Sequence, residues 1–405
     1  MCAAGFATFV ALYASQALLP ALATDFALSP AMASLAVSAA TGALAIGVVP
    51  LTALSEAVGR TRVMTASLFV SSALGLLTAI SPNFTVLLVL RALQGLALAG
   101  VPAVAMSYLA EEIHPASLGS AMGLYIAGNS IGGMSGRLIS GLVDGLTDWR
   151  WALATVGVIA MGCTVLFRMC VLPSGRFKAR PAQLGALSAS IFKAARDLTL
   201  VRLYLIGFVL MGVFVTIYNY LGFRLLGPEF HLPKTVVGLI FVAYLAGSYS
   251  AATGGKLVGR FGRRWMLLGS AVLTVGGLAL MVTSQLILVI LGLLVVTAGF
   301  FAAHTVASGW VGARSAALGV QGSALYLFLY YIGSSFGGSL GGIWYGMHGW
   351  TAVVIYTVAL MALAIAITPN KDTKAGRAEA VKKDLAKTDA VTTDAVTEKA
   401  QQPAV

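Results

Sequence analysis

Charged residues are scarce in this chain: they make up 10% of its 405 residues, whereas hydrophobic residues make up 59%. A soluble domain of this length needs a more polar surface, so water is excluded as its main solvent. The sequence also lacks the roughly ten-residue alternation of polar and apolar positions that marks a transmembrane β-barrel. Its apolar runs instead reach about 20 residues, enough to cross ~30 Å of hydrocarbon as helices. We therefore predict an all-α membrane protein embedded in a lipid bilayer.

Cysteine and histidine are also rare. The three cysteines have no metal-ligand spacing and the four histidines lie in separate segments, so the pattern predicts neither a disulfide framework nor a metal site. It also offers no nucleophile and base of the kind an enzyme needs. The nearest approach to a nucleotide-binding loop, Gly254 to Leu257, lacks the required hydroxyl residue. We therefore expect no cofactor, no enzymatic activity and no ATP-driven transport.

The formal net charge of +12 reflects an excess of Lys and Arg. In a membrane protein these residues mark the loops that stay in the cytoplasm, so they predict topology rather than a nucleic-acid partner. Most of them fall on one face, in the loops around Arg60, Arg176 to Arg202 and Arg260 to Arg264, and in the C-terminal tail. We predict that both termini are cytoplasmic. Because no Lys or Arg precedes Arg60, we do not expect the first span to be a cleaved signal peptide.

The apolar runs divide the chain into twelve predicted spans. They lie near residues 4–24, 31–54, 63–80, 85–109, 119–143, 151–172, 203–226, 235–257, 265–283, 286–311, 317–345 and 350–368. Residues 173–202 are predicted to be a cytoplasmic linker because they combine prolines with basic clusters. Residues 369–405 lack an apolar face and are predicted to be a disordered cytoplasmic tail. The linker separates a bundle at residues 1–172 from a second bundle at 203–368.

An internal repeat relates these two bundles. A shift of 203 residues places Gly59 and Arg60 on Gly262 and Arg263, and Gly119 on Gly322. Parallel duplication of this kind predicts two pseudo-symmetric six-helix bundles. It also places the substrate site between them, near the middle of the membrane.

Four segments carry recognisable motifs. Residues 54–62 read Leu-Ser-Glu-Ala-Val-Gly-Arg-Thr-Arg, residues 255–264 read Gly-Lys-Leu-Val-Gly-Arg-Phe-Gly-Arg-Arg, residues 90–95 read Leu-Arg-Ala-Leu-Gln-Gly, and residues 128–137 read Gly-Asn-Ser-Ile-Gly-Gly-Met-Ser-Gly-Arg. Together they resemble the major facilitator superfamily over essentially the whole of 1–368. With Phe300 to His304 and Ser323 to Ser335 added, they resemble its YnfM-type branch of drug:proton antiporter-like members. Several positions depart from the family pattern: Ala57 replaces an arginine, Gly133 a proline and Arg137 a glycine.

The resemblance implies roles for several residues. Gating of the cytoplasmic side is implied for Glu56, Gly59, Arg60, Arg62, Gly262 and Arg263, with Glu56 pairing with nearby arginines when that side is closed. Close helix packing is implied for Gly95, Gly128, Gly132, Gly133 and Gly136, since lipid offers no hydrophobic drive for helix association and small residues let backbones approach.

Ionisable groups inside the membrane cost about 2.5 to 3.5 kcal/mol each on insertion scales, so the few that occur are functional candidates. Arg91, Arg137 and His304 lie well inside spans, whereas all fourteen acids lie at helix ends, in loops or in the tail. We therefore expect no buried carboxylate in the cavity. His304 is the leading candidate proton carrier because an unperturbed imidazole has a pKa of about 6.5. Arg91 and Asp25 are further proton-coupling candidates, and structural roles for the buried ionisable groups remain open.

Polar and aromatic residues within the spans provide candidates for the substrate cavity: Arg137, Gln16, Tyr13, Asn129, Tyr218, Asn219 and Tyr330. Two arginines without an internal acid favour anions or neutral amphiphiles. Cationic dyes, with which the branch is associated, would require aromatic walls that can hold planar cations.

These features predict a secondary active transporter of the cell membrane that exports a small organic molecule or drug in exchange for protons by alternating access. We expect it to be a monomer. Proton-coupled uptake, facilitated diffusion of a metabolite and lipid flipping remain open within transport. A non-transporting receptor or scaffold is an alternative of a different class.

Overall fold

The computed structural model describes residues 1–172, 174–175, 192–318 and 322–370, and every regular element in these residues is a helix. The first half of the chain contains α1 (Cys2–Leu12), the 3-10 helix η1 (Ala14–Gln16), α2 (Leu19–Asp25), α3 (Pro30–Val58), α4 (Arg60–Ala79), α5 (Phe84–Leu98), α6 (Gly100–Glu112), α7 (Pro115–Leu146) and α8 (Trp149–Cys170). The second half contains α10 (Leu198–Leu226), α11 (Lys234–Gly238), η2 (Leu239–Ala243), α12 (Tyr244–Phe261), α13 (Arg263–Leu280), α14 (Leu286–Leu318) and α15 (Gly322–Ile367).

Within the described residues, eight helices are long and apolar enough to cross a membrane, and the bent pair formed by Cys2–Gln16 and Leu19–Asp25 makes a ninth. The last helix, α15, turns back at Gly349, where φ is 68°. These nine, together with α7, α13 and the second segment of α15, make the twelve helical segments expected from the sequence. The seventh begins at Leu198, earlier than predicted, and most of the predicted linker and tail lies outside the described residues.

Capping residues and glycines set the ends of the helices. The Ser29 hydroxyl accepts a hydrogen bond from the Met32 N–H at the start of α3, and the Asp197 carboxylate accepts one from the Leu200 N–H at the start of α10. Gly59 separates α3 from α4 with φ at 114°, and Gly262 separates α12 from α13 with φ at 81°. Only glycine adopts such angles readily. The two repeated loops therefore make the same kind of turn.

Glycines let α7 pack closely against α1. A Cβ atom added to Gly128, Gly132 or Gly136 would lie nearer than 3.0 Å to backbone atoms of α1, and one added to Gly95 would meet the backbone of α3 in the same way. Gly133 differs, since its added Cβ would have nothing nearer than Nη1 of Arg137 at 3.4 Å. Close backbone contact therefore holds the first half together, as expected where solvent supplies no hydrophobic drive.

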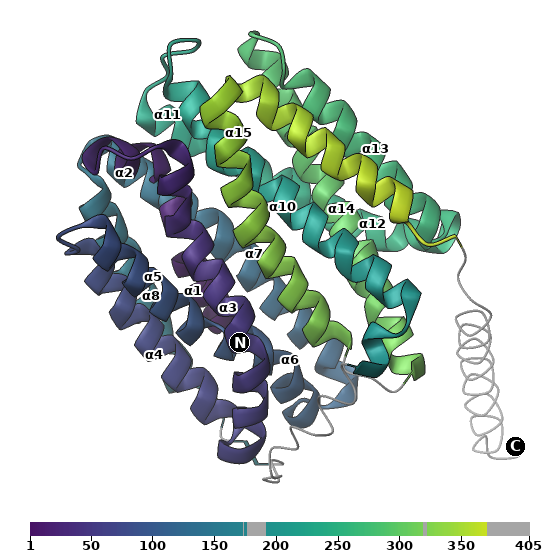
Figure 1. The fold of residues 1–405 in the computed structure, drawn as a ribbon. Coiled ribbons are helices and arrows are strands. Elements are labelled where there is room, and N and C mark those ends of the chain that lie inside the picture. Colours follow the sequence, from purple (N-terminus) through teal and green to yellow (C-terminus); the bar gives the residue numbers. More distant parts are fainter. Residues whose placement is uncertain (173, 176–191, 319–321, 371–405) are drawn as a thin grey trace, which may run out of the picture.

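The two halves of the chain lie side by side, the purple and blue helices of the first beside the teal to yellow helices of the second (Figure 1). We call the end that holds Asp25, Asp144 and Lys234 the far end, and the end that holds Arg60 and Asp197 the linker end. In the described part of the chain, the hydrogen bonds and ion pairs between the halves lie in the middle and at the far end. They join Gln16 to Asn219, Ser38 to Ser335 and Ser339, and Asp144 to Lys234.

Candidate functional site

The first span is broken near the middle of the molecule. Helix α1 ends at Leu12, and Tyr13 has a φ of −106° before η1 begins. Backbone carbonyls freed by such a break need donors, because lipid supplies none. Arg91 of α5 provides them, with Nη1 3.1 Å from the Ala11 carbonyl and Nη2 donating to the Leu12 carbonyl. Its Nε lies 3.0 Å from the carbonyl of Ala36 in α3.

The structure thus places Arg91 inside the first half of the chain, with all three guanidinium nitrogens occupied. Its Nη1 also donates to Gln94 Oε1 at 2.5 Å, and the side chain is only 1% exposed. A guanidinium keeps its protons in proteins, so it cannot release them to a substrate cycle. The geometry favours a structural role for Arg91 over the proton-coupling role considered from the sequence.

The other buried arginine lies where the halves meet. Arg137 of α7 donates from Nε to Gln16 Oε1 at 2.5 Å and from Nη1 to the Gly133 carbonyl at 2.6 Å. Gln16 then donates from Nε2 to Asn219 Oδ1 at 2.7 Å. Arg137, Gln16 and Asn219 are each at most 2% exposed. Three candidates chosen separately from the sequence therefore form one hydrogen-bonded chain across η1, α7 and α10.

Aromatic rings surround this chain. The Arg137 guanidinium carbon lies 4.1 Å from the Tyr13 ring centroid and 4.7 Å from that of Tyr244. Tyr218 stacks on Phe241 with centroids 5.4 Å apart, and its hydroxyl lies 2.8 Å from Thr297 Oγ1. We call the connected rings of the second half the aromatic cluster; it comprises Phe214, Tyr218, Phe241, Tyr244, Phe300 and Phe301. Such a surface suits planar or aromatic ligands.

His304 of α14 extends the aromatic cluster. Its ring stacks on Phe300 with centroids 5.9 Å apart, and it lies 4.6 Å from the ring of Tyr330. The imidazole Nδ1 is 3.0 Å from the Tyr326 hydroxyl. Among the described residues, none of its hydrogen-bond or ring partners is a carboxylate. The structure therefore brings His304 and Tyr330 together in a neutral aromatic setting.

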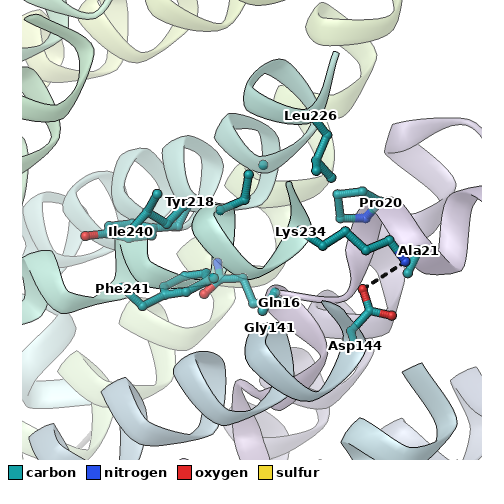
Figure 2. A pocket seen from close by; sticks show the side chains of 14 residues that line it. Gln16, Pro20, Ala21, Gly141, Asp144, Tyr218, Leu226, Lys234, Ile240 and Phe241 are labelled. Carbon is teal, nitrogen blue, oxygen red and sulfur yellow. Dashed lines mark ion pairs between the residues drawn. The ribbon is translucent and has the colours of Figure 1, made fainter. Parts of the chain in front are cut away.

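A small pocket lies between the halves at the far end. Figure 2 shows Tyr218 and Phe241 on one side of it and the Asp144–Lys234 ion pair on the other, with Gln16 between them. The Asp144 side chain is 6% exposed. The expectation of no buried carboxylate in the cavity is therefore wrong. In the sequence Asp144 is a helix-end acid, but the packing of α11 against α7 covers it.

The remaining candidates lie outside this centre. Asp25 is exposed at the far end and accepts a hydrogen bond from Trp149 Nε1 at 2.9 Å. The Oδ1 atom of Asn129 has no hydrogen-bond partner in the described part of the chain, and it lies next to Gly5 of α1. The structure thus separates both residues from the chain that joins the halves.

At the linker end, Arg60 pairs with Glu111 at 2.9 Å, and its Nη1 donates to Ser55 Oγ at 2.6 Å. Glu56 forms no ion pair with a described residue here, so its implied pairing in a closed state stays a prediction. Glu111 and the pair of Asp144 with Lys234 were not among the predicted site residues. The sequence offers one signal for these pairs. Each acid lies within a few residues of the end of its helix, and that helix end faces a basic residue of another span.

The family model described as Major Facilitator Superfamily matches residues 1–226 and 205–400. The chain belongs to the major facilitator superfamily. It is 42% identical over 364 residues to the uncharacterized MFS-type transporter YybF of Bacillus subtilis, covering 90% of each chain. It is also 42% identical over 364 residues to the inner membrane transport protein YnfM of Escherichia coli, covering 90% of this chain and 87% of that one. The resemblance to the YnfM-type branch is thereby confirmed.

More distant matches agree on the fold. A bacterial homologue of the human lysosomal transporter Spinster, in an inward-facing and occupied conformation, superposes with a TM-score of 0.72 at 15% identity and covers 91% of this chain and 92% of that chain. Over 171 residues, or 40% of this chain and 24% of its own, the MFS antiporter QDR3 of Candida albicans is 33% identical. The prediction of an all-α membrane protein with the major facilitator fold is confirmed. The chain is a multi-pass membrane transporter.

Proposed function

We propose that this transporter exports small organic molecules in exchange for protons by alternating access. The observation that carries the proposal is the placement of the contacts between the halves. In the described residues they form a middle layer, with Gln16 and Asn219, and a far-end layer, with Asp144 and Lys234. Contacts confined to one side of a central site can break while others form at the opposite side. Alternating access requires this property.

The placement of the basic residues indicates how the protein is oriented in the membrane. The linker end carries the basic loops, so the positive-inside rule assigns it to the cytoplasm together with both termini. In that orientation the far end, closed by Gly141 against Gly238 and by the Asp144–Lys234 pair, faces outward. We infer from this orientation that the state described here is the one open toward the cytoplasm. We propose that the protein works in this orientation in the cell membrane, as a monomer.

His304 is the proposed proton carrier. Its imidazole contacts the aromatic cluster through Phe300, and an imidazole can gain and lose a proton, whereas the guanidinium of Arg137 keeps its protons. Protonation would place a positive charge between Phe300 and Tyr330, where it competes with a bound substrate for the same rings. Asp25 is a weaker candidate because it is exposed and already held by Trp149. Competition of this kind couples proton uptake to substrate release.

Export is favoured over uptake by the antiporter-like motifs of the fourth and fifth spans. The local similarity to a protein described as an MFS antiporter supports exchange. Proton-coupled uptake moves protons with the substrate, whereas facilitated diffusion and lipid flipping move none, so one assay separates proton exchange from these alternatives.

The test uses proteoliposomes with an internal pH dye and an imposed proton gradient, with anionic, neutral and cationic aromatic compounds as substrates. Proton movement opposite to substrate, lost in His304→Ala, is the expected result. Substrate movement without a proton signal would overturn coupling and leave a facilitator or flippase. Absence of any substrate movement, with the protein monodisperse, would favour a receptor or scaffold.

A further inference from the structure

Arg137 presents an incompletely used guanidinium edge at the junction of the two halves. Nε and Nη2 form one edge of an arginine side chain, and this edge matches the two oxygens of a carboxylate. In Arg137, Nε donates to the single amide oxygen of Gln16, while Nη2 donates to no described residue. The remaining nitrogen, Nη1, is occupied by the Gly133 carbonyl. Half of the edge is therefore unused.

Two other arginines in this chain show what the same edge does when an acid is available. Arg224 holds Glu229 with Nε and Nη2 at 2.6 Å from separate carboxylate oxygens. Arg60 holds Glu111 with Nε at 3.3 Å and Nη2 at 2.9 Å from the same oxygen. Arg137 has no such acid among the described residues, although it is only 1% exposed. A buried cation without an anion is unfavourable, so the site suits an anion from outside the chain.

The hydrogen bonds beside Arg137 have a fixed direction. Because a guanidinium only donates, Gln16 must turn its oxygen toward Arg137 and its NH₂ toward Asn219 Oδ1. The Asn219 NH₂ then points away, and its Nδ2 atom has no partner in the described residues. This unpartnered donor is 1% exposed and lies near Gly338 of α15. The chain thus ends in a second buried donor on the opposite half.

Two further hydroxyls lie against the same part of α15. The Tyr13 hydroxyl, on the residue whose ring covers Arg137, faces the Ser334 hydroxyl of α15, and neither oxygen bonds to any other described residue. Ser334 lies one helical turn before Gly338, where Asn219 Nδ2 approaches. A cation, an amide donor and two hydroxyls therefore surround the junction, with aromatic rings around them. This combination recognises an oxyanion attached to an aromatic group.

We propose that Arg137 and Asn219 bind the carboxylate of an aromatic organic acid, and that Gln16 occupies its place when no substrate is bound. The Gln16 amide oxygen takes one of the two bonds that a substrate carboxylate takes, so its displacement completes the Nε–Nη2 edge. Because Gln16 and Asn219 come from different halves, binding also breaks a contact that joins the halves. The proposal rests on the proposed transport function and names its substrate class.

The test measures binding to purified protein in detergent by isothermal titration calorimetry, without a membrane or a proton gradient. Three probes share one ring system and differ in charge: 1-naphthoate, 1-naphthylmethanol and 1-naphthylmethylammonium. Wild type should bind naphthoate about tenfold or more tightly than either of the others, because charge-assisted hydrogen bonds contribute more than neutral ones. Equal binding of the three probes, or no naphthoate binding at millimolar concentration, would overturn the proposal.

Two substitutions and a control localise the binding. Arg137→Gln should weaken naphthoate binding about tenfold or more, whereas Arg150→Gln, the same charge change at the far end, should not. Gln16→Glu supplies an internal carboxylate to Arg137, as Glu229 does for Arg224. The Gln16→Glu variant should abolish naphthoate binding while keeping or raising the thermal stability. It therefore tests whether naphthoate binds at Arg137 even if Arg137→Gln folds poorly. Naphthoate binding that survives Gln16→Glu contradicts the assigned site. Binding without proton-linked transport in liposomes would instead refute only the coupling.

Discussion

Asp144 of α7 and Lys234 of α11 form an ion pair of 3.1 Å that joins the two halves at the far end. The partners differ in environment, since the Asp144 side chain is 6% exposed and the Lys234 side chain 46% exposed. Removing the lysine leaves a buried carboxylate without its countercharge, which is more unfavourable than removing the acid. The pair is therefore asymmetric, and the two neutralising substitutions should have different effects.

Lys234→Gln should open the far end. The uncompensated carboxylate favours a state in which water reaches Asp144, so labelling of a cysteine introduced at Ala17, which lines the pocket, should rise several-fold with a membrane-impermeant maleimide. Asp144→Asn should raise the labelling less. The double exchange, Asp144→Lys with Lys234→Asp, should restore the wild-type rate. Equal labelling in all four proteins would show that the pair does not hold this end closed.

A methyl group at Gly141 should also prevent closure. A Cβ there would lie 2.7 Å from the Gly238 Cα, too near for the two helices to keep their contact. Gly222→Ala is the control, because its nearest neighbour would be a Pro20 side-chain atom at 3.6 Å. We expect Gly141→Ala to reduce transport several-fold while Gly222→Ala retains it. Transport by Gly141→Ala at the wild-type rate would show that α7 and α11 need not touch.

Thermal stability should fall in acid because of Asp197. Burial raises the pKa of this carboxyl, but the hydrogen bond from Arg314 and those from the Leu200 and Thr199 N–H groups outweigh it, so the net pKa is below its usual range. A depressed carboxyl pKa contributes stability that is fully present above the unfolded value of about 3.9 and is lost as pH falls through the lower, folded value.

The measurement is Tm in detergent as the pH is lowered from neutral to below 4. Wild type should lose more Tm than Asp197→Asn over the acid range, because the variant has already lost the titrating group. The Asn side chain can still cap α10, so the comparison isolates the charge. Parallel acid profiles for the two proteins would contradict the assignment.

At the linker end, Glu111 rather than Glu56 should support the state seen here. Glu111→Gln removes the charge that Arg60 holds at 2.9 Å and should lower Tm by a few degrees, equivalent to about 1 kcal/mol for a partly exposed pair. Glu56→Gln should leave Tm nearly unchanged and instead alter the transport rate, if Glu56 pairs when this end closes. A large drop in Tm from Glu56→Gln would refute that division of roles.

The sequence could predict the fold because its signals are local and repeated. Apolar runs give the spans, and the 203-residue repeat correctly pairs Gly59 with Gly262, which share a left-handed backbone. The same reasoning selected Arg137, Gln16 and Asn219 because polar residues are conspicuous in apolar spans. It could not show that they bond to one another, since their contact depends on how three helices are rotated and on the break after Leu12.

Two features of the site could not be predicted for a common physical reason. The burial of Asp144 and the contacts of Arg91 are not visible in the sequence, because sequence alone does not show what covers a helix end or where a helix breaks. The structure supplies both facts: α11 covers Asp144, and the interrupted first span offers its carbonyls to Arg91. Neither the covering of Asp144 by α11 nor the break in the first span produces a periodic pattern in the sequence.

The arginine that fills the break in the first span also limits how this part of the protein can evolve. Without Arg91, the carbonyls of Ala11 and Leu12 would lack their hydrogen-bond donor inside the bilayer. Without the break, the charged Arg91 side chain would lie among carbonyls that already accept hydrogen bonds within the helix. Either change alone is unfavourable, so the two features must be inherited or lost together. A relative with an apolar residue at this position should therefore have a straight first helix, and its Tyr13 and Gln16 counterparts would face different neighbours.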